Sequence, residues 1–451
     1  MIIDIFYKKK LASGLLLLFF LIPSFTILGP FIPDLIISVT VIFFIIISLT
    51  ENKDNKINIL FKDTFIKIFI LFYFYLLFIS LINFINQDDF SFENFKNFFS
   101  RSLFLFRFFV YPLALLYLIS NFKLEIKKNY FFIILLTIFF VIFDCIFQYL
   151  NGGKDIFGFV AEERGSNAIG RLSGPFGDEL IPGSYLMRYF FIGLLSLYFV
   201  LKKKIFNYAM TPYIFIFLLT ILLTGERSAF ILATFGVFIY FLIFSEYRRS
   251  VIISTVLVFF LATLVLLLNP ILKKRVINET LFQLGVTLTL EKKLNLGSID
   301  INLEKIVDSH YGAHWETAYR IWEDNKLIGI GLKQFRTRCS DDDYNDIQSK
   351  LRTIRCATHP HNTYFELLSE TGAIGLLIFL TLIFVLYKKI LKLYKLKKSI
   401  KFLLISVILL TWPIITTGSF FTNQTLIYFS FLITNIFFIE NNLLKKLETQ
   451  K

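Results

Sequence analysis

Long runs of apolar side chains alternate with short polar segments along almost the whole chain. Most runs approach 20 residues, and a helix of about 20 residues at 1.5 Å per residue spans the hydrocarbon core of a bilayer. The first run follows three lysines but lacks a small-residue cleavage site, so we expect it to be retained as a helix. The pattern predicts twelve transmembrane helices, over residues 11–28, 31–49, 66–85, 103–120, 130–150, 184–201, 209–223, 228–245, 251–268, 373–387, 402–417 and 425–439.

The placement of basic residues predicts how these helices are oriented. Clusters such as Lys8–Lys10, Lys202–Lys204 and the lysines between 388 and 401 fall on alternate connections. The positive-inside rule places those connections, and both termini, in the cytoplasm. The two long connections, 151–183 and 269–371, then lie on the outer face, where the second is expected to form a partly helical cap.

The fold class is therefore an all-α polytopic membrane protein with a large periplasmic loop between spans 9 and 10. We divide the chain into 1–268 with nine spans and the outer loop 151–183, the large loop 269–371, and 372–451 with three spans and a cytoplasmic tail. Composition agrees, since 56% of residues are hydrophobic and only 18% are charged. The net charge of +14 lies in loop clusters, so we expect membrane lipids and no nucleic acid as partners.

Both cysteines of the large loop, Cys339 and Cys356, are expected on the outer side of the membrane. A disulfide between them fits an oxidising compartment such as the periplasm, and two unpaired thiols are the alternative.

Charged residues inside apolar spans are costly and need a reason. Arg107, Asp144 and Arg188 all lie near the outer ends of their helices under this topology. They form internal ion pairs, for which Arg107 with Asp144 is one possibility, or they line a polar cavity, and both interpretations can hold together.

Two short motifs carry the candidate chemistry. In the turn TGERS at 224–228, Arg227 and a helix N-terminus suit an anion, although an arginine reaching toward lipid headgroups is the alternative. In HPHNTYFELLSETGAIG at 359–375, His359 and His361 flank a proline and are expected in extended backbone. Asn362 or Thr363 can cap the following helix, with Glu366 near its first turn. Histidine there suits proton abstraction, or else forms a structural hydrogen-bonded corner.

The helix expected in the large loop carries further candidates. His310 and His314 at i and i+4 resemble half a zinc site, but no third ligand is evident, so we predict no metal. Glu316, one turn before Arg320, could pair with that arginine as a solvated ion pair.

In their order along the chain, these motifs resemble the O-antigen ligase and polymerase superfamily of membrane glycosyltransferases. The TGER turn precedes two spans and a long outer loop. That loop contains Tyr319-Arg320-Ile321-Trp322 and GIGLKQF, and His361-Asn362 is followed after nine residues by GAIG at 372–375. The stretch RLSGPFGDELIPGSYL at 171–186 is also similar, and the resemblance is strongest over 140–380.

The resemblance implies metal-independent, inverting transfer of a glycan from undecaprenyl diphosphate to lipid A–core, at the periplasmic face of a bacterial inner membrane and without a cofactor. It implies that Arg227 and Arg320 bind the donor diphosphate and that His361 is the base. Supporting candidates are Arg107, Asp144, Arg171, Arg188, His359, Asn362 and Glu366. Leu376, where ligases often have threonine, leaves open an O-antigen polymerase, which uses another glycan as its acceptor, or a protein O-oligosaccharyltransferase. A transporter or flippase for lipid-linked sugars is the alternative of another class, although it would need charges across the midplane and usually internal repeats.

Overall fold

The computed structural model describes residues 2–50, 63–87, 90–160, 169–283, 286–289, 298–301, 309–347, 349, 352–413 and 418–441. Within these residues, nine helices have the length and apolar composition to cross a membrane. The first half of the chain contains α1 (Ile2–Phe25), η1 (Thr26–Leu28), α2 (Phe31–Thr50), α4 (Thr64–Ile85), α5 (Phe92–Asn94), η2 (Phe95–Ser100), α6 (Arg101–Phe104), α7 (Phe106–Phe122), α8 (Lys128–Leu150), η5 (Gly174–Phe176), α9 (Pro182–Val200) and α10 (Lys203–Leu223).

The second half continues with α11 (Arg227–Ile243), α12 (Arg248–Leu268), α13 (Pro270–Lys273), η6 (Lys274–Asn278), α14 (Glu279–Gln283), β1 (Val286–Thr289), β2 (Ser298–Ile301), α16 (His310–Asp324), α17 (Phe335–Arg338), η7 (Asp342–Tyr344), η8 (Arg352–Ile354), α18 (Thr363–Leu396), α19 (Ile400–Leu410) and α20 (Asn423–Glu440). The two strands pair antiparallel, with Val286 opposite Ile301. They add a pair of short strands to a loop that we expected to be partly helical.

A helix covers all or part of each of the twelve ranges expected from the sequence, which confirms an all-α polytopic membrane protein. The eleventh helix is shorter than expected, because α19 ends at Leu410. Residues 414–417 of the predicted span 402–417 lie outside the described part of the chain. The number of crossings and their direction stay predictions.

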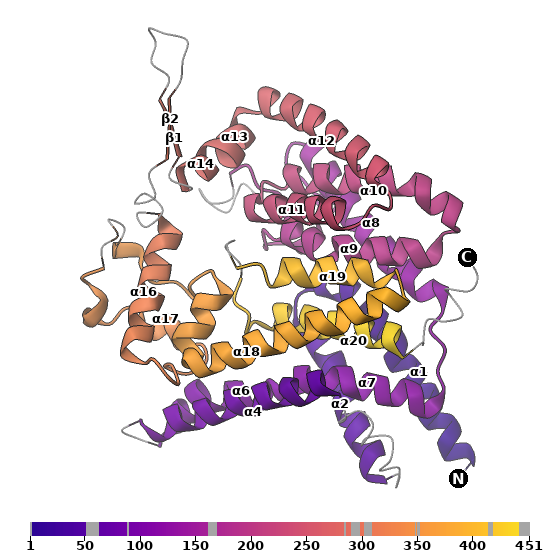
Figure 1. Cartoon of the computed structure of the whole chain (residues 1–451), viewed down its shortest axis with the longest axis vertical. Helices are drawn as coiled ribbons and strands as arrows, with labels where there is room; N and C mark the ends of the chain where they lie inside the picture. Colours follow the sequence, from indigo (N-terminus) through magenta and orange to yellow (C-terminus); the bar gives the residue numbers. More distant parts are fainter. Residues whose placement is uncertain are drawn as a thin grey trace.

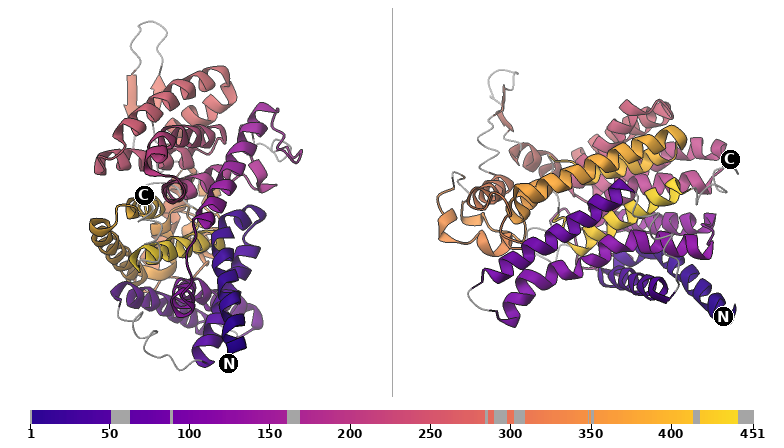
Figure 2. Two further views of the ribbon diagram at one scale, coloured as in Figure 1. Left: turned by 90° about the vertical axis from the view of Figure 1, so that its right-hand side faces the viewer. Right: turned by 60° about the horizontal axis from the view of Figure 1, so that its bottom comes forward.

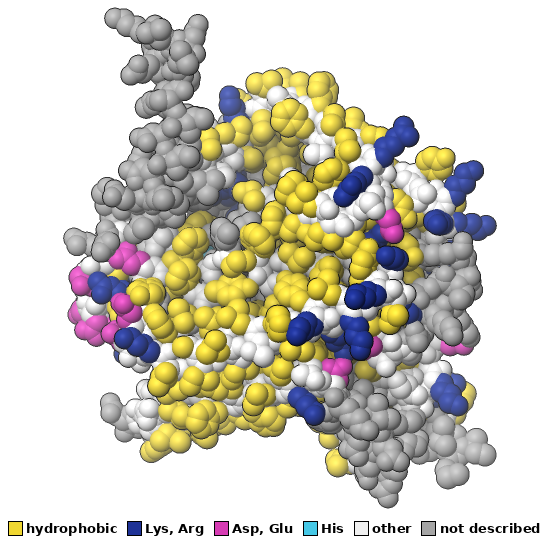
Figure 3. Space-filling view, in the orientation of Figure 1, with side chains coloured by type: hydrophobic (Ala, Val, Ile, Leu, Met, Phe, Trp, Pro, Cys, Tyr) yellow, Lys and Arg dark blue, Asp and Glu magenta, His cyan; other side chains and the backbone are white. Residues whose placement is uncertain are grey.

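The bundle has interior and peripheral helices. In the most apolar stretch of each helix, 72% of α9 is buried inside the protein, but only 17% of α12. Helix α9 therefore lies in the interior, while α12 leaves most of its surface to lipid. Helix α20 is also buried on nearly all faces. Aromatic rings fill the space between helices, as in Phe19 and Phe431 with centroids 4.6 Å apart. Figure 3 shows the broad hydrophobic surface that these helices leave exposed.

The two ends of the bundle differ in charge and in structure. Lys389 on α18 forms ion pairs with Asp63, which caps α4, and with Glu440 at the end of α20. Lys401 pairs with Glu246. The elements α16 and α17 lie at the other end, as a cap beside the start of α18 (Figures 1 and 2). Which side of the membrane each end faces stays a prediction.

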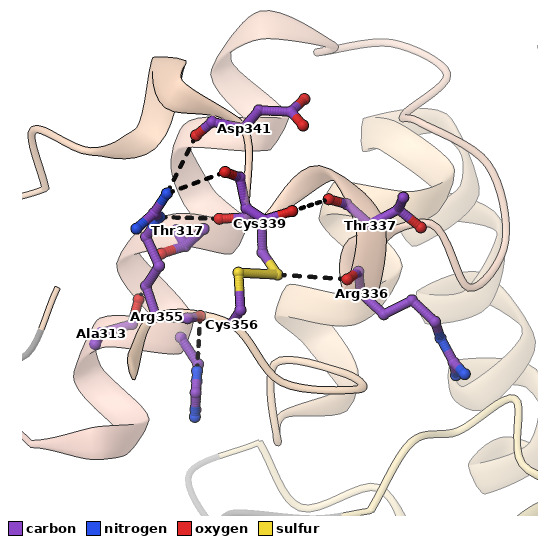
Figure 4. Close-up of a disulfide and its surroundings, with 10 residues drawn as sticks. Ala313, Thr317, Arg336, Thr337, Cys339, Asp341, Arg355 and Cys356 are labelled. Carbon is purple, nitrogen blue, oxygen red and sulfur yellow. Dashed lines mark hydrogen bonds between the residues drawn. A yellow bond between two sulfur atoms is a disulfide. The ribbon is translucent and has the colours of Figure 1, made fainter. Parts of the chain in front are cut away.

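The cap has a small core and a covalent cross-link. Its buried residues are Ala318, Ile321, Ile330, Phe335, Cys339 and Tyr344. Cys339 and Cys356 form a disulfide, as predicted, while Cys145 in α8 is a free, buried cysteine. Arg355 stabilises the chain next to this disulfide, because its Nε donates to the Cys339 carbonyl at 2.9 Å (Figure 4).

A break in α18 joins the cap to the bundle. Gly372 has a left-handed φ of 67°, which interrupts the helix. The freed backbone bonds to the turn before α17: Ala373 N donates to Lys326 O at 2.9 Å, and Ile330 N donates to Ser369 O at 3.0 Å. A Cβ atom at position 372 would lie 2.2 Å from Leu327 O, so only glycine fits. The close approach at Gly372 is therefore a backbone contact with the cap.

Candidate active site

His361 lies at the corner where the cap meets α18. Its ring is half-buried among His359, His314 and Tyr311, with centroid distances of 4.2, 5.5 and 5.6 Å. Its ring nitrogens form no hydrogen bond with any residue that the structure describes. Burial, and then the neighbouring charges of His359 and His314, lower the pKa of His361 to about 3. The imidazole is therefore neutral at pH 7 and can accept a proton.

The backbone at this corner differs from the expectation. We predicted extended backbone for both histidines, but His361 has a φ of 55°, in the left-handed region. Pro360 restricts only the residue before it, His359, so the restriction does not extend to His361. The turn that results points the chain directly into α18.

Asn362 fixes the direction of this turn. Its side-chain oxygen accepts from the amides of Tyr364 (2.9 Å) and Phe365 (3.2 Å), which confirms the predicted cap. Its amide nitrogen donates to Pro413 O at 2.8 Å. Glu366 is buried and points elsewhere, since its carboxylate accepts from Ser419 and from Phe420 N. Asn362 thus positions the histidine corner, and Glu366 joins α18 to the segment before α20.

The TGER turn joins three segments. Gly225 has a φ of 70°, and α11 begins at Arg227. Glu226 caps the start of α9: its carboxylate accepts from Gly183 N at 2.6 Å and from Ser184 N at 3.2 Å. Burial raises the pKa of Glu226, while the Ser184 hydrogen bond and the charge of Arg171 act in the opposite direction.

Arginines surround this turn. Arg227 lies 3.4 Å from Glu279 of α14, and Arg171 lies 4.0 Å from Glu226. Arg275 in η6 donates from Nε to Gly225 O at 3.0 Å. Burial, and then the charges of Arg171 and Arg227, lower the pKa of Arg275, while the charges of Glu279 and Glu226 act in the opposite direction. Arg275 was not predicted as a site residue from the sequence, because it directly follows two lysines, a pattern typical of a solvated basic cluster.

A cavity of about 70 Å³ borders one residue of each motif. Its walls include Ser228, directly after Arg227, Thr363, two residues after His361, and Arg188 of α9. Arg188 also borders a second cavity of about 170 Å³, together with Tyr185, Tyr189 and Tyr428. Its guanidinium bonds to Thr425 at 3.3 Å, and no carboxylate of the described residues lies within 4 Å. A cation placed in this way is available to an anionic ligand.

Part of the chain is similar to a known protein family. Residues 212–380, from α10 through the cap to the middle of α18, match the family model described as O-antigen ligase. This part of the chain is therefore similar to the O-antigen ligase family, and we refer to residues 212–380 as the ligase domain. No curated protein matches the chain. The ligase domain contains Arg227, Arg275, Arg320 and His361, whereas Arg188 lies outside the match.

Arg320 lies on the surface of the ligase domain's cap, apart from the cavity. Its side chain is 41% exposed, and its closest carboxylates are Glu323 and Asp346, both at 3.8 Å. The suggested pairing with Glu316 is wrong, because Glu316 accepts a hydrogen bond from Ser349 N at 3.1 Å instead. The structure thus brings Arg188, the start of α11 and the histidine corner together, and leaves Arg320 outside that group.

The other intramembrane charges have separate partners. The suggested pair of Arg107 with Asp144 is wrong: Arg107 forms a bidentate pair with Asp34 at the start of α2, and Asn423 donates to the same carboxylate at 3.0 Å. Asp144 is buried and accepts from Ile156 N at 2.9 Å. Asp144 therefore stabilises the loop after α8, and Arg107 joins α7 to α2 and α20.

Among the described side chains, no three His, Cys, Asp or Glu residues form a group that could bind a metal ion. The side chain of His310 lies outside the described part of the chain.

Proposed function

We propose that this protein is an O-antigen ligase-type glycosyltransferase that moves a glycan from undecaprenyl diphosphate to lipid A–core at the periplasmic face of the inner membrane. The ligase domain supports a membrane enzyme that joins glycans. The observation that supports the proposal most is the cavity lined by Arg188, Ser228 and Thr363, because Ser228 directly follows Arg227 and Thr363 lies two residues after His361.

The donor diphosphate is assigned to the arginine side of this cavity. Negative charge builds on the diphosphate as the bond to the sugar breaks, and fixed guanidinium groups in a poorly solvated site oppose that charge without a metal ion. Arg188 lines the cavity and Arg227 directly precedes Ser228 on its wall, and the N-terminus of α11 adds a further favourable field. Arg320 lies on the cap, so it can bind the donor only if the donor extends as far as the cap. Its two ion pairs, both at 3.8 Å, hold the Arg320 side chain only weakly.

His361 is assigned as the base. The acceptor hydroxyl gives its proton to a ring nitrogen of His361 while its oxygen bonds to the anomeric carbon. The bond between that carbon and the phosphate oxygen breaks, and the diphosphate leaves with the electron pair. Attack from the face opposite the leaving group inverts the configuration at this carbon. The neutral imidazole is the form that this step needs.

Purified protein in lipid vesicles, supplied with a polyprenyl diphosphate glycan and lipid A–core, tests this assignment. His361→Gln removes the base at similar volume, and we expect a fall in kcat of at least about 100-fold with donor binding retained. Arg338→Ala is the matched control for loss of charge, because Arg338 is exposed and pairs with Asp341 on the surface of the cap. Transfer at the wild-type rate by the Gln variant would refute the role of His361.

The acceptor is tested in the cell. Deletion of the gene should leave bare lipid A–core and polymer on its lipid carrier. Single repeat units on lipid A–core would indicate a polymerase instead, and loss of glycan from proteins alone would indicate a protein O-oligosaccharyltransferase. Movement of lipid-linked sugar between leaflets without transfer to any acceptor would indicate a transporter.

A further inference from the structure

A row of three cavities begins at the candidate active site. The first, of about 70 Å³, is bordered by Ser228 and Thr363. It shares four lining residues with the second, of about 170 Å³, namely Ser184, Arg188, Gly418 and Tyr428. The second shares four with a third, of about 360 Å³, namely Thr26, Phe176, Ile181 and Gln424. The second cavity therefore adjoins both of the others, and we call the third the outer cavity.

The outer cavity lies where connections between helices meet. Its walls come from residues 26–30 between α1 and α2, from Phe157 and Phe159 after α8, from residues within 175–181 around the start of α9, and from Gln424 in α20. The predicted orientation places all of these helix ends on the outer side. These segments lie outside the ligase domain, so the similarity to the ligase family does not account for this cavity.

Aromatic rings continue from the outer cavity to Arg188. The ring centroids of Phe176 and Tyr185 lie 5.1 Å apart, and those of Tyr185 and Tyr189 lie 4.6 Å apart. Tyr428 follows, with its centroid 5.5 Å from that of Tyr189 and 6.0 Å from the Arg188 guanidinium carbon. All five side chains line the second cavity. At the other end of the row, Phe157 and Phe159 add two exposed rings, whose backbone amides both donate to the Asp155 carboxylate.

The polar groups of the outer cavity suit a ligand with hydroxyl groups. The Glu179 carboxylate accepts hydrogen bonds, and the Gln424 amide both donates and accepts. The Thr26 hydroxyl donates to Pro23 O at 2.7 Å, and its oxygen can still accept. Among the described residues of this wall, none is a lysine or an arginine, so the outer cavity lacks the charge that favours a phosphate.

We propose that the outer and second cavities bind uncharged sugar units of the acceptor, with the reacting hydroxyl in the first cavity. A sugar ring has C–H groups on its faces and hydroxyl groups at its edge, which matches aromatic walls with a few polar groups. The volume of the outer cavity lies in the range of about 300–1,000 Å³ that is typical of ligand sites. This inference rests on the proposed function only in naming the sugar as that of the acceptor.

The direction of the row favours the acceptor over the donor. Inversion requires the acceptor hydroxyl to attack from the side opposite the diphosphate. Ser228, next to Arg227, borders only the first of the three cavities, whereas Arg188 borders the first and the second. The row therefore extends away from the start of α11, where the diphosphate is assigned.

Lipid-free probes test this binding without transfer. Full-length protein in nanodiscs is titrated with dephosphorylated core oligosaccharide and with the O-antigen repeat unit, both released from lipopolysaccharide of the same bacterium, and with geranyl diphosphate as a donor mimic. Gln424→Leu removes the amide at similar volume, and Phe157→Ala removes an exposed ring. Phe92→Ala is the matched control, because Phe92 is 80% exposed and borders none of the three cavities. Thermal unfolding of each variant reports whether the fold is intact.

We expect Gln424→Leu and Phe157→Ala each to raise the Kd of the better-bound saccharide about fivefold, since each removes one contact with the sugar. The Kd of geranyl diphosphate should stay within about twofold of the wild type, as should both Kd values in Phe92→Ala.

A covalent block tests the row as a path. Cys145 is buried, and Cys339 and Cys356 are bridged, which accounts for all three cysteines of the chain. Polyethylene-glycol maleimide should therefore react selectively with Phe157→Cys or with the control Phe92→Cys. We expect labelled Phe157→Cys to lose at least about tenfold in saccharide affinity and to keep its affinity for geranyl diphosphate, with both affinities retained in labelled Phe92→Cys.

Wild-type saccharide Kd values in both Gln424→Leu and labelled Phe157→Cys would overturn the inference. Loss of geranyl diphosphate binding alone in these variants would overturn it too, because the row would then hold the donor. Wild-type glycan transfer by labelled Phe157→Cys would contradict the inference and leave the proposed function standing. If the saccharide binds through Gln424 and no glycan is transferred to any acceptor, the proposed function fails and this site stands.

Discussion

Asn362 offers a direct test of how the histidine corner is positioned. Its side chain makes three hydrogen bonds: two accepted from the first amides of α18 and one donated to Pro413 O. The cap contributes about 1 kcal/mol and the bond to Pro413 a similar amount. Asn362→Ala should therefore destabilise this corner by about 2 kcal/mol, and Asn362→Asp, which keeps the cap, by about 1 kcal/mol.

The two variants separate the cap from the bond to Pro413. Hydrogen exchange at the amides of Tyr364 and Phe365 should accelerate in Asn362→Ala and stay near wild type in Asn362→Asp. Transfer should respond differently, because both variants lose the bond that orients the residue after His361. Small displacements of a reacting group cost up to about 100-fold in rate, so we expect kcat to fall about tenfold or more in both.

The KM for the donor should change little in either variant, since no arginine of the site contacts Asn362. A merely structural role would lower the amount of folded protein and leave the kcat of the folded fraction unchanged. Unaltered exchange at Tyr364 and Phe365 in Asn362→Ala would refute the hydrogen-bond assignment. A wild-type kcat in Asn362→Asp would refute the link between Pro413 and the position of His361.

Three further predictions follow from the cap and its junction with the bundle. Gly372→Ala should release the cap from α18, because the added Cβ would lie 2.2 Å from Leu327 O. Proteolysis of the cap should then be faster than in the wild type. Gly14→Ala is the control and should have no effect, since no atom lies within 4 Å of the added carbon. Cys356→Ser should destabilise the cap by about 3 kcal/mol, since the disulfide joins residues 17 positions apart, and protease should cleave that loop faster than in the bridged protein. His361 has a folded pKa of about 3, below the usual value of 6.5, so the unfolded chain takes up this proton first as pH falls. The contribution of the neutral ring to the free energy of unfolding is complete above pH 6.5, and it is lost toward pH 3 by about 1.4 kcal/mol per pH unit. Thermal unfolding of the wild type between pH 7 and 5 should therefore show a decrease in stability that His361→Gln lacks.

The sequence alone was sufficient for the helices and for the local motifs. Apolar runs of membrane-spanning length predict helices whatever their neighbours are, because lipid imposes the same requirement on each segment. The cap of α18 at Asn362 and the helix start at Arg227 depend on residues a few positions apart, so they too could be predicted. The disulfide was predictable because the large loop contains only two cysteines.

Only the tertiary structure decided which charges meet. Arg107 pairs with Asp34 from a distant helix rather than with Asp144, because the direction of each side chain depends on how α2, α7 and α20 pack. Arg188 borders the cavity next to the start of α11, and Arg275 reaches the TGER turn, for the same reason. A sequence shows that a buried charge needs a partner, but the identity of the partner depends on contacts between segments far apart in the chain.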